Sequence, residues 1–269
     1  MGWARKLTAA LAGALLATGP LGPVPARAVV GGHEARPHQY PFMAGLVDLA
    51  ERRVMCGGAL IGDRWVLTAA HCLTGSYGDT ARVGVLLGEH DLTRGDESPN
   101  AVLVAPAAFL THPGYDPAAQ RDDIALVRLA EPVVFNRDVR PVALPAGYAH
   151  DSFDHTRVEA PGWGATSFGG RTSDVLRTVL LDTMDNAACG ARGVPRVTSA
   201  QLCTYTPGRD TCQYDSGGPL VRSVAGRPYL IGLVSYGKGC ATDTPAVNTR
   251  VWSHLSWIGR TTGPLPPAP

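Results

Sequence analysis

The sequence lacks an excess of charge of either sign and contains almost no lysine. Its 269 residues include 24 basic and 23 acidic residues, which leave a formal net charge of +1. All basic residues except Lys6 and Lys238 are arginines. Without a basic excess, the sequence does not predict an electrostatic nucleic-acid binder. No internal repeat and no nucleotide or haem motif is evident, so we expect neither a repeat architecture nor a cofactor of these kinds.

A long apolar run is also missing near the N-terminus. Residues 7–17 are apolar and uncharged, but a bilayer-spanning helix needs about 20 such residues. Arg5 and Lys6 precede this run, prolines follow it, and Ala26-Arg27-Ala28 has the small-x-small pattern of a signal peptidase site. We therefore predict a signal peptide at residues 1–28, a secreted mature protein and no stable membrane association after cleavage. The alternatives are an uncleaved membrane anchor and a buried helix.

The cysteines lack the spacing of a zinc site. None of the six forms a CxxC pair or a tight cluster with histidine, so we expect no metal centre of this kind. An even number of cysteines in an exported protein predicts three disulfides, and the spacing alone leaves their connectivity open. The six are Cys56, Cys72, Cys189, Cys203, Cys212 and Cys240.

The sequence does contain enough apolar material for a core. Hydrophobic residues make up 45% and charged residues 17% of the chain, which argues against disorder, and the length allows one or two domains. One helix is expected where Val251, Leu255 and Ile258 share a face, and the Pro-rich residues 264–269 are expected to be disordered. Short apolar or alternating runs predict β-strands near 54–61, 65–69, 83–88, 124–129, 175–182 and 229–236.

Three segments hold the residue types of a nucleophilic triad. His71 lies in Ala69-Ala70-His71-Cys72, Asp123 precedes Ile124-Ala125-Leu126, and Ser216 lies in Asp215-Ser216-Gly217-Gly218-Pro219. Taken singly, each has a more common structural interpretation: a buried histidine, a capping aspartate and a Ser-Gly-Gly turn. In the order His, Asp, Ser they match one arrangement of the acyl-transfer triad.

These motifs resemble those of the trypsin/chymotrypsin-type serine proteases, peptidase family S1. The resemblance runs from Val29-Val30-Gly31-Gly32 through Trp163-Gly164 to Trp257-Ile258. It implies an all-β fold of two perpendicular six-stranded antiparallel β-barrels with a C-terminal α-helix. We therefore expect a protease domain at 29–263, with barrels near 29–140 and 141–250 and the helix near 251–262.

The resemblance also implies a role for each site residue. Ser216 would be the nucleophile, His71 its base and acid, and Asp123, rather than Asp122, the partner of His71. The backbone N–H groups of Tyr214 and Ser216 would form the oxyanion hole. The implied disulfides are Cys56–Cys72, Cys189–Cys203 and Cys212–Cys240.

Activation and specificity follow from the same resemblance. A new amine at Val29 would pair with Asp215, and cleavage after Ala28 would both remove the signal peptide and activate the enzyme. The implied specificity pocket contains Asp210, Thr211, Ser235, Gly237 and Ala246. A buried carboxylate at Asp210 would select arginine or lysine. We expect a monomeric secreted serine endopeptidase that cleaves protein or peptide substrates after Arg and less well after Lys.

Three positions depart from the family pattern. Tyr214 replaces a glycine of the oxyanion hole, Ala246 replaces a glycine of the pocket wall, and Asn248 replaces a nearby tyrosine. The tyrosine would restrict the backbone if the site needs a glycine-like conformation. The alternative hypothesis is therefore a catalytically weak protease homologue that acts as a binding module.

A calcium loop is one interpretation of Leu87-Gly88-Glu89-His90-Asp91 with Asp96 and Glu97, which carry possible oxygen ligands. A solvated acidic loop is the interpretation we favour, so we expect no cofactor.

Overall fold

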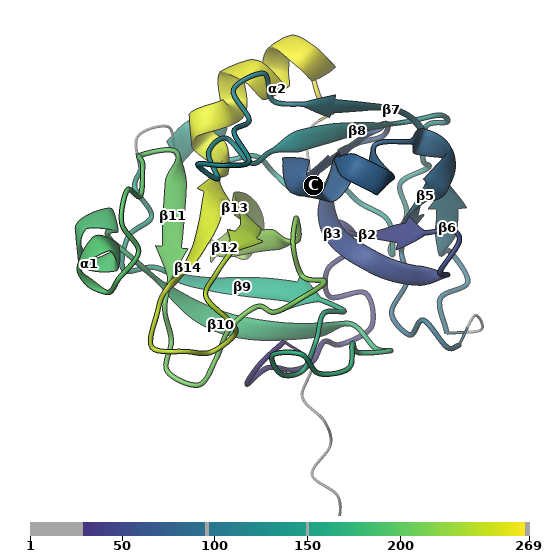
Figure 1. Ribbon diagram of the computed structural model, residues 1–269. Helices are drawn as coiled ribbons and strands as arrows, with labels where there is room; N and C mark the ends of the chain where they lie inside the picture. Colours follow the sequence, from purple (N-terminus) through teal and green to yellow (C-terminus); the bar gives the residue numbers. More distant parts are fainter. Residues whose placement is uncertain (1–28, 95–96, 149–150, 267–269) are drawn as a thin grey trace, which may run out of the picture.

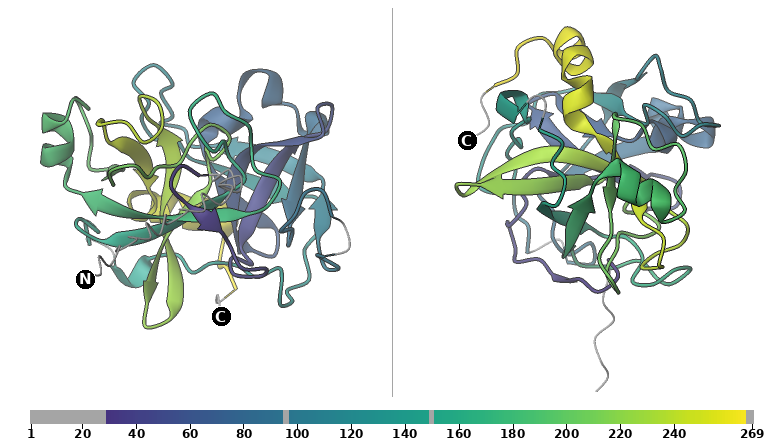
Figure 2. Two further views of the ribbon diagram at one scale, coloured as in Figure 1. Left: turned by 90° about the horizontal axis from the view of Figure 1, so that it is seen from below. Right: turned by 90° about the vertical axis from the view of Figure 1, so that its left-hand side faces the viewer.

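The computed structural model describes residues 29–94, 97–148 and 151–266. The predicted signal peptide and Asp96 lie outside the described residues. The described chain is mostly β and forms two antiparallel sheets that lie side by side, as the two views in Figure 2 show. Figure 1 labels the strands and helices used below.

The first sheet is built from the N-terminal half of the chain and curls without closing. Its order is β6-β5-β2-β3-β4-β8-β7. At its edges, β6 has only three residues and β7 begins with Pro106, which has no N–H to donate. The strands are β2 (Met43–Asp48), β3 (Arg53–Gly62), β4 (Trp65–Thr68), β5 (Val83–Leu87), β6 (Val102–Val104), β7 (Pro106–Thr111) and β8 (Ala125–Leu129).

The second sheet closes on itself. Its order is β1-β10-β11-β14-β13-β12-β9, and an additional pairing of β9 with β10 completes a barrel of six strands with β1 attached outside it. A closed sheet leaves no unpaired edge. The strands are β1 (His33–Glu34), β9 (Arg157–Gly162), β10 (Arg177–Met184), β11 (Gln201–Thr204), β12 (Pro219–Val224), β13 (Arg227–Tyr236) and β14 (Ala246–Arg250).

The two sheets meet where glycines let their backbones approach. A Cβ atom on Gly57 of β3 would lie 2.7 Å from the Cα atom of Gly218, just before β12. Real Cβ atoms do not come this close to backbone atoms, so a larger residue at position 57 would push the sheets apart. The N–H of Gly57 donates to the carbonyl of Ser216 at 2.8 Å. This close contact brings the serine segment against the first sheet.

The C-terminal helix packs on the first sheet although it follows the second. A 3-10 turn (Val251–His254) leads into α2 (Leu255–Thr262), whose Trp257 and Ile258 join the core of the first sheet. The helix lies beside β7 and β8 in Figure 1. Leu265, in the tail predicted to be disordered, also packs against this core. A second short helix, α1 (Asn186–Ala191), begins after the capping side chain of Asp185.

The predicted fold class is confirmed. All six predicted strands are present, as β3, β4, β5, β8, β10 and β13, and the helix lies where its apolar face predicted. The barrel prediction needs one refinement, because the first sheet is a curled half-barrel and only the second closes. No helix among the described residues is long and apolar enough to span a membrane.

Candidate active site

His71 and Asp123 meet because their strands are neighbours. Strand β4 ends at Thr68, which lies opposite Ala125 at the start of the antiparallel strand β8. His71 follows β4 in a 3-10 turn (Ala70–Leu73), and Asp123 precedes β8. Both residues therefore lie at the same edge of the first sheet. The Nδ1 atom of His71 is 2.7 Å from Oδ2 of Asp123, and the His71 backbone N–H donates to Oδ1 at 2.9 Å.

The Asp123 carboxylate is buried, yet it stays ionised. Burial alone would raise its pKa, but hydrogen bonds from His71 and Ser235 hold the pKa below its ordinary value. The Ser235 hydroxyl donates to Oδ2 at 2.5 Å, and the Thr249 hydroxyl donates to the Asp123 backbone carbonyl at 2.7 Å. An ionised carboxylate in this position can orient the imidazole and stabilise its protonated form.

Asp122 has a different partner. Its backbone has φ +49°, and its Oδ1 atom is 2.9 Å from Nε2 of His254 at the start of α2. The Nδ1 atom of His254 is in turn 3.0 Å from the carbonyl of Arg250. Of the two adjacent carboxylates, only that of Asp123 faces His71.

Ser216 lies in the loop that precedes β12. Its carbonyl is 3.6 Å from Sγ of Cys72, and the same sulfur is 3.8 Å from Nε2 of His71. The serine and the histidine therefore lie close to one disulfide. Both residues are described, and no hydrogen bond joins the Ser216 hydroxyl to the His71 ring. This contact is often long before substrate binds.

Two backbone N–H groups beside the serine have no partner within the described chain. They belong to Tyr214 and Ser216, whereas their neighbours Asp215 and Gly217 donate to the carbonyls of Cys212 and Val234. Two free donors around a nucleophile are what an oxyanion hole requires.

Tyr214 adopts a backbone conformation that is typical of glycine. Its φ is +74°, which costs a residue with a Cβ atom about 1–2 kcal/mol. The Arg53 guanidinium lies 4.9 Å from the centroid of the Tyr214 ring, and contact with Tyr214 raises the pKa of Arg53. The N–H of Tyr214 has no hydrogen-bond partner within the described chain, so the tyrosine side chain does not block this donor.

Asp210 lies in a cavity of about 160 Å³ that also contains Ser216. The aspartate is 7% exposed, and burial raises its pKa to about 6. Its Oδ2 atom accepts a hydrogen bond from the N–H of Ala241 at 3.0 Å. Among the described residues no cation pairs with this carboxylate, so the cavity offers a buried negative charge to a cationic side chain.

All the residues predicted for this pocket line the cavity. They are Asp210, Thr211, Ser235, Gly237 and Ala246. Ala246 faces Gly237, since a Cβ atom on Gly237 would lie 3.7 Å from the methyl carbon of Ala246. Asn248 does not line the cavity. Its amide donates across to β11, to the carbonyl of Leu202 and the hydroxyl of Thr204, both at 3.1 Å.

Asp215 is fully buried beside the serine. Its carboxylate accepts hydrogen bonds from the N–H groups of Gly164 and Cys212, both at 2.9 Å, and burial raises its pKa to about 7. Val29 is also buried, and the adjacent Val30 accepts a hydrogen bond from the N–H of Asp210 at 3.1 Å. The N-terminal segment of the protease domain thus reaches the loop that carries Asp215. In the uncleaved chain, the nitrogen of Val29 is part of a peptide bond and carries no charge.

The structure contains three disulfides, and they are the pairs that the resemblance implied. Cys56–Cys72 anchors the turn of His71, Cys212–Cys240 crosses the Asp210 cavity wall, and Cys189–Cys203 fastens α1 to β11. The described chain has no free cysteine.

The described acidic residues of the candidate calcium loop have other partners. Asp91 accepts hydrogen bonds from the N–H and hydroxyl of Thr93, and Glu97 forms an ion pair with Arg94 at 2.5 Å. In the part of the chain that the structure describes, these carboxylates do not gather into a cluster that could hold a metal ion. Asp96 lies outside the described residues, and the absence of a calcium ion stays a prediction of the sequence.

The resemblance placed Ser235-Tyr236-Gly237 along the substrate backbone, but sequence reasoning missed that Tyr236 lines three cavities and that Arg53 contacts Tyr214. Tyr236 lines the Asp210 cavity, the cavity beside His71 and a larger third cavity. The tyrosine hydroxyl accepts a hydrogen bond from Gln201 at 3.3 Å. The only sequence signal for this role was the motif Ser235-Tyr236-Gly237 at the end of an apolar strand.

The chain has two antiparallel sheets. A histidine–aspartate pair lies at the edge of one sheet, and a serine loop precedes a strand of the other. This arrangement defines the class of the chymotrypsin-like serine proteases. A family model described as Trypsin matches residues 29–258. The chain therefore belongs to the trypsin family of serine proteases.

Individual relatives agree with this assignment. The chain is 37% identical to serine protease 1 of Rattus norvegicus, covering 86% of this chain and 88% of the relative. It is 34% identical to trypsin-1 of Astacus astacus, covering 86% and 98%. It is also 34% identical to venom serine protease 34 of Apis mellifera over 86% of this chain, but it spans only 57% of that relative's length.

Proposed function

We propose that this chain is a secreted serine endopeptidase that hydrolyses peptide bonds after arginine and, less well, after lysine. The buried Asp210 carboxylate in the cavity of Ser216 carries the proposal. A guanidinium entering this cavity forms a charge-assisted, geometrically specific pair with a carboxylate. Relatives named as trypsins and venom proteases favour the same activity and an extracellular location.

The catalytic steps follow from the positions of three side chains. The Ser216 oxygen attacks the carbonyl carbon of the substrate, and its proton passes to Nε2 of His71. Asp123 holds Nδ1 of the ring and stabilises the imidazolium. The N–H groups of Tyr214 and Ser216 donate to the oxyanion, which is an interaction worth roughly 10²–10³ in rate for one donor.

The acyl-enzyme then forms and breaks down. His71 returns its proton to the leaving nitrogen as the C–N bond breaks, which leaves an ester between Ser216 and the new carboxyl group. Water next gives a proton to His71 while its oxygen attacks the ester carbonyl carbon. His71 then returns this proton to the Ser216 oxygen as the ester C–O bond breaks, which releases the carboxylic acid and restores the serine hydroxyl.

Maturation would occur at the bond between Ala28 and Val29. The ammonium group of Val29 would then pair with Asp215, whose buried carboxylate lacks a cationic partner among the described residues. A buried charge that lacks a partner destabilises the folded state, and an opposite charge beside it removes this cost. We expect the secreted protein to begin at Val29 and to act without added trypsin, which N-terminal sequencing and direct assay would show.

The deciding experiment compares matched Arg, Lys and Phe amide substrates on the mature protein, with Ser216→Ala as the control. We expect kcat/KM in the order Arg, Lys, Phe. Equal rates for Arg and Phe, or rates unaffected by Ser216→Ala, would overturn the proposal.

A further inference from the structure

A cavity of about 500 Å³ adjoins the cavity that contains Asp210. We refer to it as the upstream cavity, lined by residues 118–121, 193–196, 198, 236–238, 244 and 245. Tyr236 and Gly237 line both cavities, so the two cavities are neighbours. A third, smaller cavity containing His71 also shares Tyr236.

The lining of the upstream cavity is positively charged. Arg121, Arg196 and Lys238 contribute to it, and no acidic residue does. Arg121 pairs with Asp116 at 3.1 Å. Lys238 donates only to the carbonyl of Gly193 at 3.3 Å, and within the described chain neither Lys238 nor Arg196 has an ion-pair partner. Two positive charges therefore remain uncompensated at the rim.

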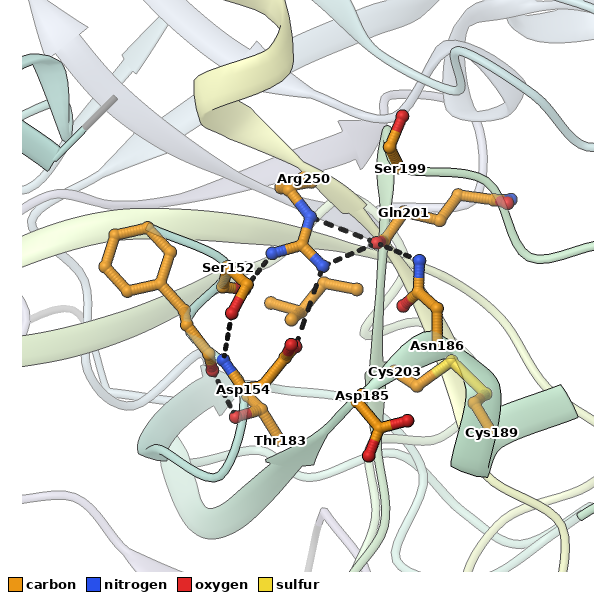
Figure 3. Close-up of polar contacts among 12 residues, drawn as sticks. Ser152, Asp154, Thr183, Asp185, Asn186, Cys189, Ser199, Gln201, Cys203 and Arg250 are labelled. Carbon is orange, nitrogen blue, oxygen red and sulfur yellow. Dashed lines mark hydrogen bonds and ion pairs between the residues drawn. A yellow bond between two sulfur atoms is a disulfide. The ribbon is translucent and has the colours of Figure 1, made fainter. Parts of the chain in front are cut away.

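The outer wall of the upstream cavity is fixed before any ligand binds. The side chain of Asn186 donates to the carbonyl of Thr198 at 2.7 Å, and the N–H of Thr198 donates to Oε1 of Gln201 at 2.9 Å. Figure 3 shows how Asn186 and the buried Arg250 both reach the backbone oxygen of Gln201, next to the Cys189–Cys203 disulfide. A preformed wall loses little entropy when it receives a side chain.

The direction of a bound peptide follows from the two cavities at the serine. A peptide with its arginine side chain beside Asp210 and its carbonyl at Ser216 can place its preceding residues along Tyr236 and Gly237, because these two residues line both cavities. The first of the preceding residues can then occupy the small cavity beside His71, which Tyr236 also lines. An extended chain advances about 3.3 Å per residue, so the residues next in line reach the upstream cavity.

We propose that the upstream cavity selects substrates with an Asp or Glu two or three residues before the arginine of the cleaved bond, through Lys238 and Arg196. This inference rests on the proposed function, because it names the substrate class of the same site. Exposed ion pairs are individually weak and are screened by salt. The expected preference is therefore several-fold and fades as ionic strength rises.

The test uses peptide amides that end in arginine and carry Glu, Gln or Lys at each of these two positions. At low ionic strength we expect kcat/KM for Glu to exceed that for Gln by about 2- to 5-fold, with Lys lowest. Lys238→Glu and Arg196→Glu should each reverse the order of Glu and Lys. Arg128→Glu, an exposed charge reversal in β8, is the control for net charge and should leave the order unchanged.

A simple arginine amide without upstream residues separates the two proposals. If neither this amide nor any peptide is cleaved, the proposed function fails. If the amide is cleaved but Glu and Gln peptides differ by less than twofold, or Lys238→Glu and Arg196→Glu both leave the order unchanged, only the upstream preference fails.

Discussion

The guanidinium of Arg53 lies over the ring of Tyr214, 4.9 Å from its centroid, and so joins the start of β3 to the loop that contains Tyr214 and Ser216. Tyr214 is held at φ +74°, a conformation that glycine adopts without strain. A cation–π contact contributes about 0.5–1 kcal/mol at an exposed site. We infer that this contact offsets part of the backbone strain and keeps the Tyr214 N–H turned toward the serine.

Removing Arg53 should therefore lower the rate only while Tyr214 is present. We expect Arg53→Ala to reduce kcat by about 2- to 5-fold, as the loss of a contact of this strength implies. In a Tyr214→Gly background the same change should have no effect, because glycine needs no support at positive φ. Kinetics of the two single variants and the double variant measure this coupling, with Arg52→Ala as the control. Equal losses in both backgrounds would contradict the role assigned to Arg53.

The uncleaved chain should lose stability as the pH rises from about 4 to about 7. Burial raises the pKa of Asp215 to about 7, whereas an unfolded aspartate titrates near 3.9. Between these values the folded state binds more protons than the unfolded state, so raising the pH favours unfolding. In the form that begins at Val29, the new ammonium group would pair with Asp215 and remove most of this loss.

Thermal unfolding of both forms in a Ser216→Ala background checks this. We expect Tm of the uncleaved form to fall by several degrees relative to the mature form over this range, at roughly 2–4 °C per kcal/mol. Asp210 titrates in both forms, so the difference reports on Asp215. Asp215→Asn should make the difference in Tm between the two forms independent of pH. Parallel Tm curves for the two forms would argue against the Val29–Asp215 pair.

Binding of an aryl amidine should weaken below about pH 6. The pKa of Asp210 is raised to about 6 by burial, and only the ionised carboxylate pairs with the amidinium group. We expect affinity for the Ser216→Ala variant to fall up to about tenfold for each pH unit below this pKa. Calorimetry from pH 4.5 to 8 measures it. Asp210→Asn should be weak at every pH, and a pH-independent affinity of the parent protein would contradict the assignment.

The preference for arginine over lysine should depend on Ala246. Lysine is shorter than arginine and often needs a bridging water to reach a buried carboxylate. The methyl groups of Ala246 and Thr211 take up volume in the cavity of Asp210. We therefore expect Ala246→Gly to raise kcat/KM for Lys relative to Arg. An unchanged Arg/Lys ratio would show that the methyl group does not act sterically.

Apolar runs predicted six strands, but they did not predict every strand, since β2 (Met43–Asp48) is apolar and buried and was not predicted. Val54, Val66 and Leu126 lie in runs whose burial the sequence indicated. In β6, by contrast, Val102 and Leu103 are 40% and 57% exposed, so the strand has no alternating pattern to detect. The two residues of β1 are too few to carry any pattern. The first sheet stays open because its edge strands β6 and β7 do not pair with each other, and local sequence does not encode such pairing.

The chemical motifs of the site could be predicted from the sequence because the residue types themselves carry the chemistry. Contacts between residues that are distant in the sequence could not be predicted. Ser235 was expected to bind substrate, but its hydroxyl also donates to Asp123, 112 positions earlier in the chain. Asn248 was expected near the pocket, but its amide turns toward β11. Such contacts depend on strand register and closure, which only the folded chain specifies.

The most direct measurement is kcat/KM on an arginine amide for the parent protein, Ser216→Ala, His71→Ala and the double variant. If Ser216, His71 and Asp123 act as one unit, each single change should remove nearly all activity, and the double variant should be little worse than either. Losses that add in free energy, or an active Ser216→Ala variant, would contradict the account.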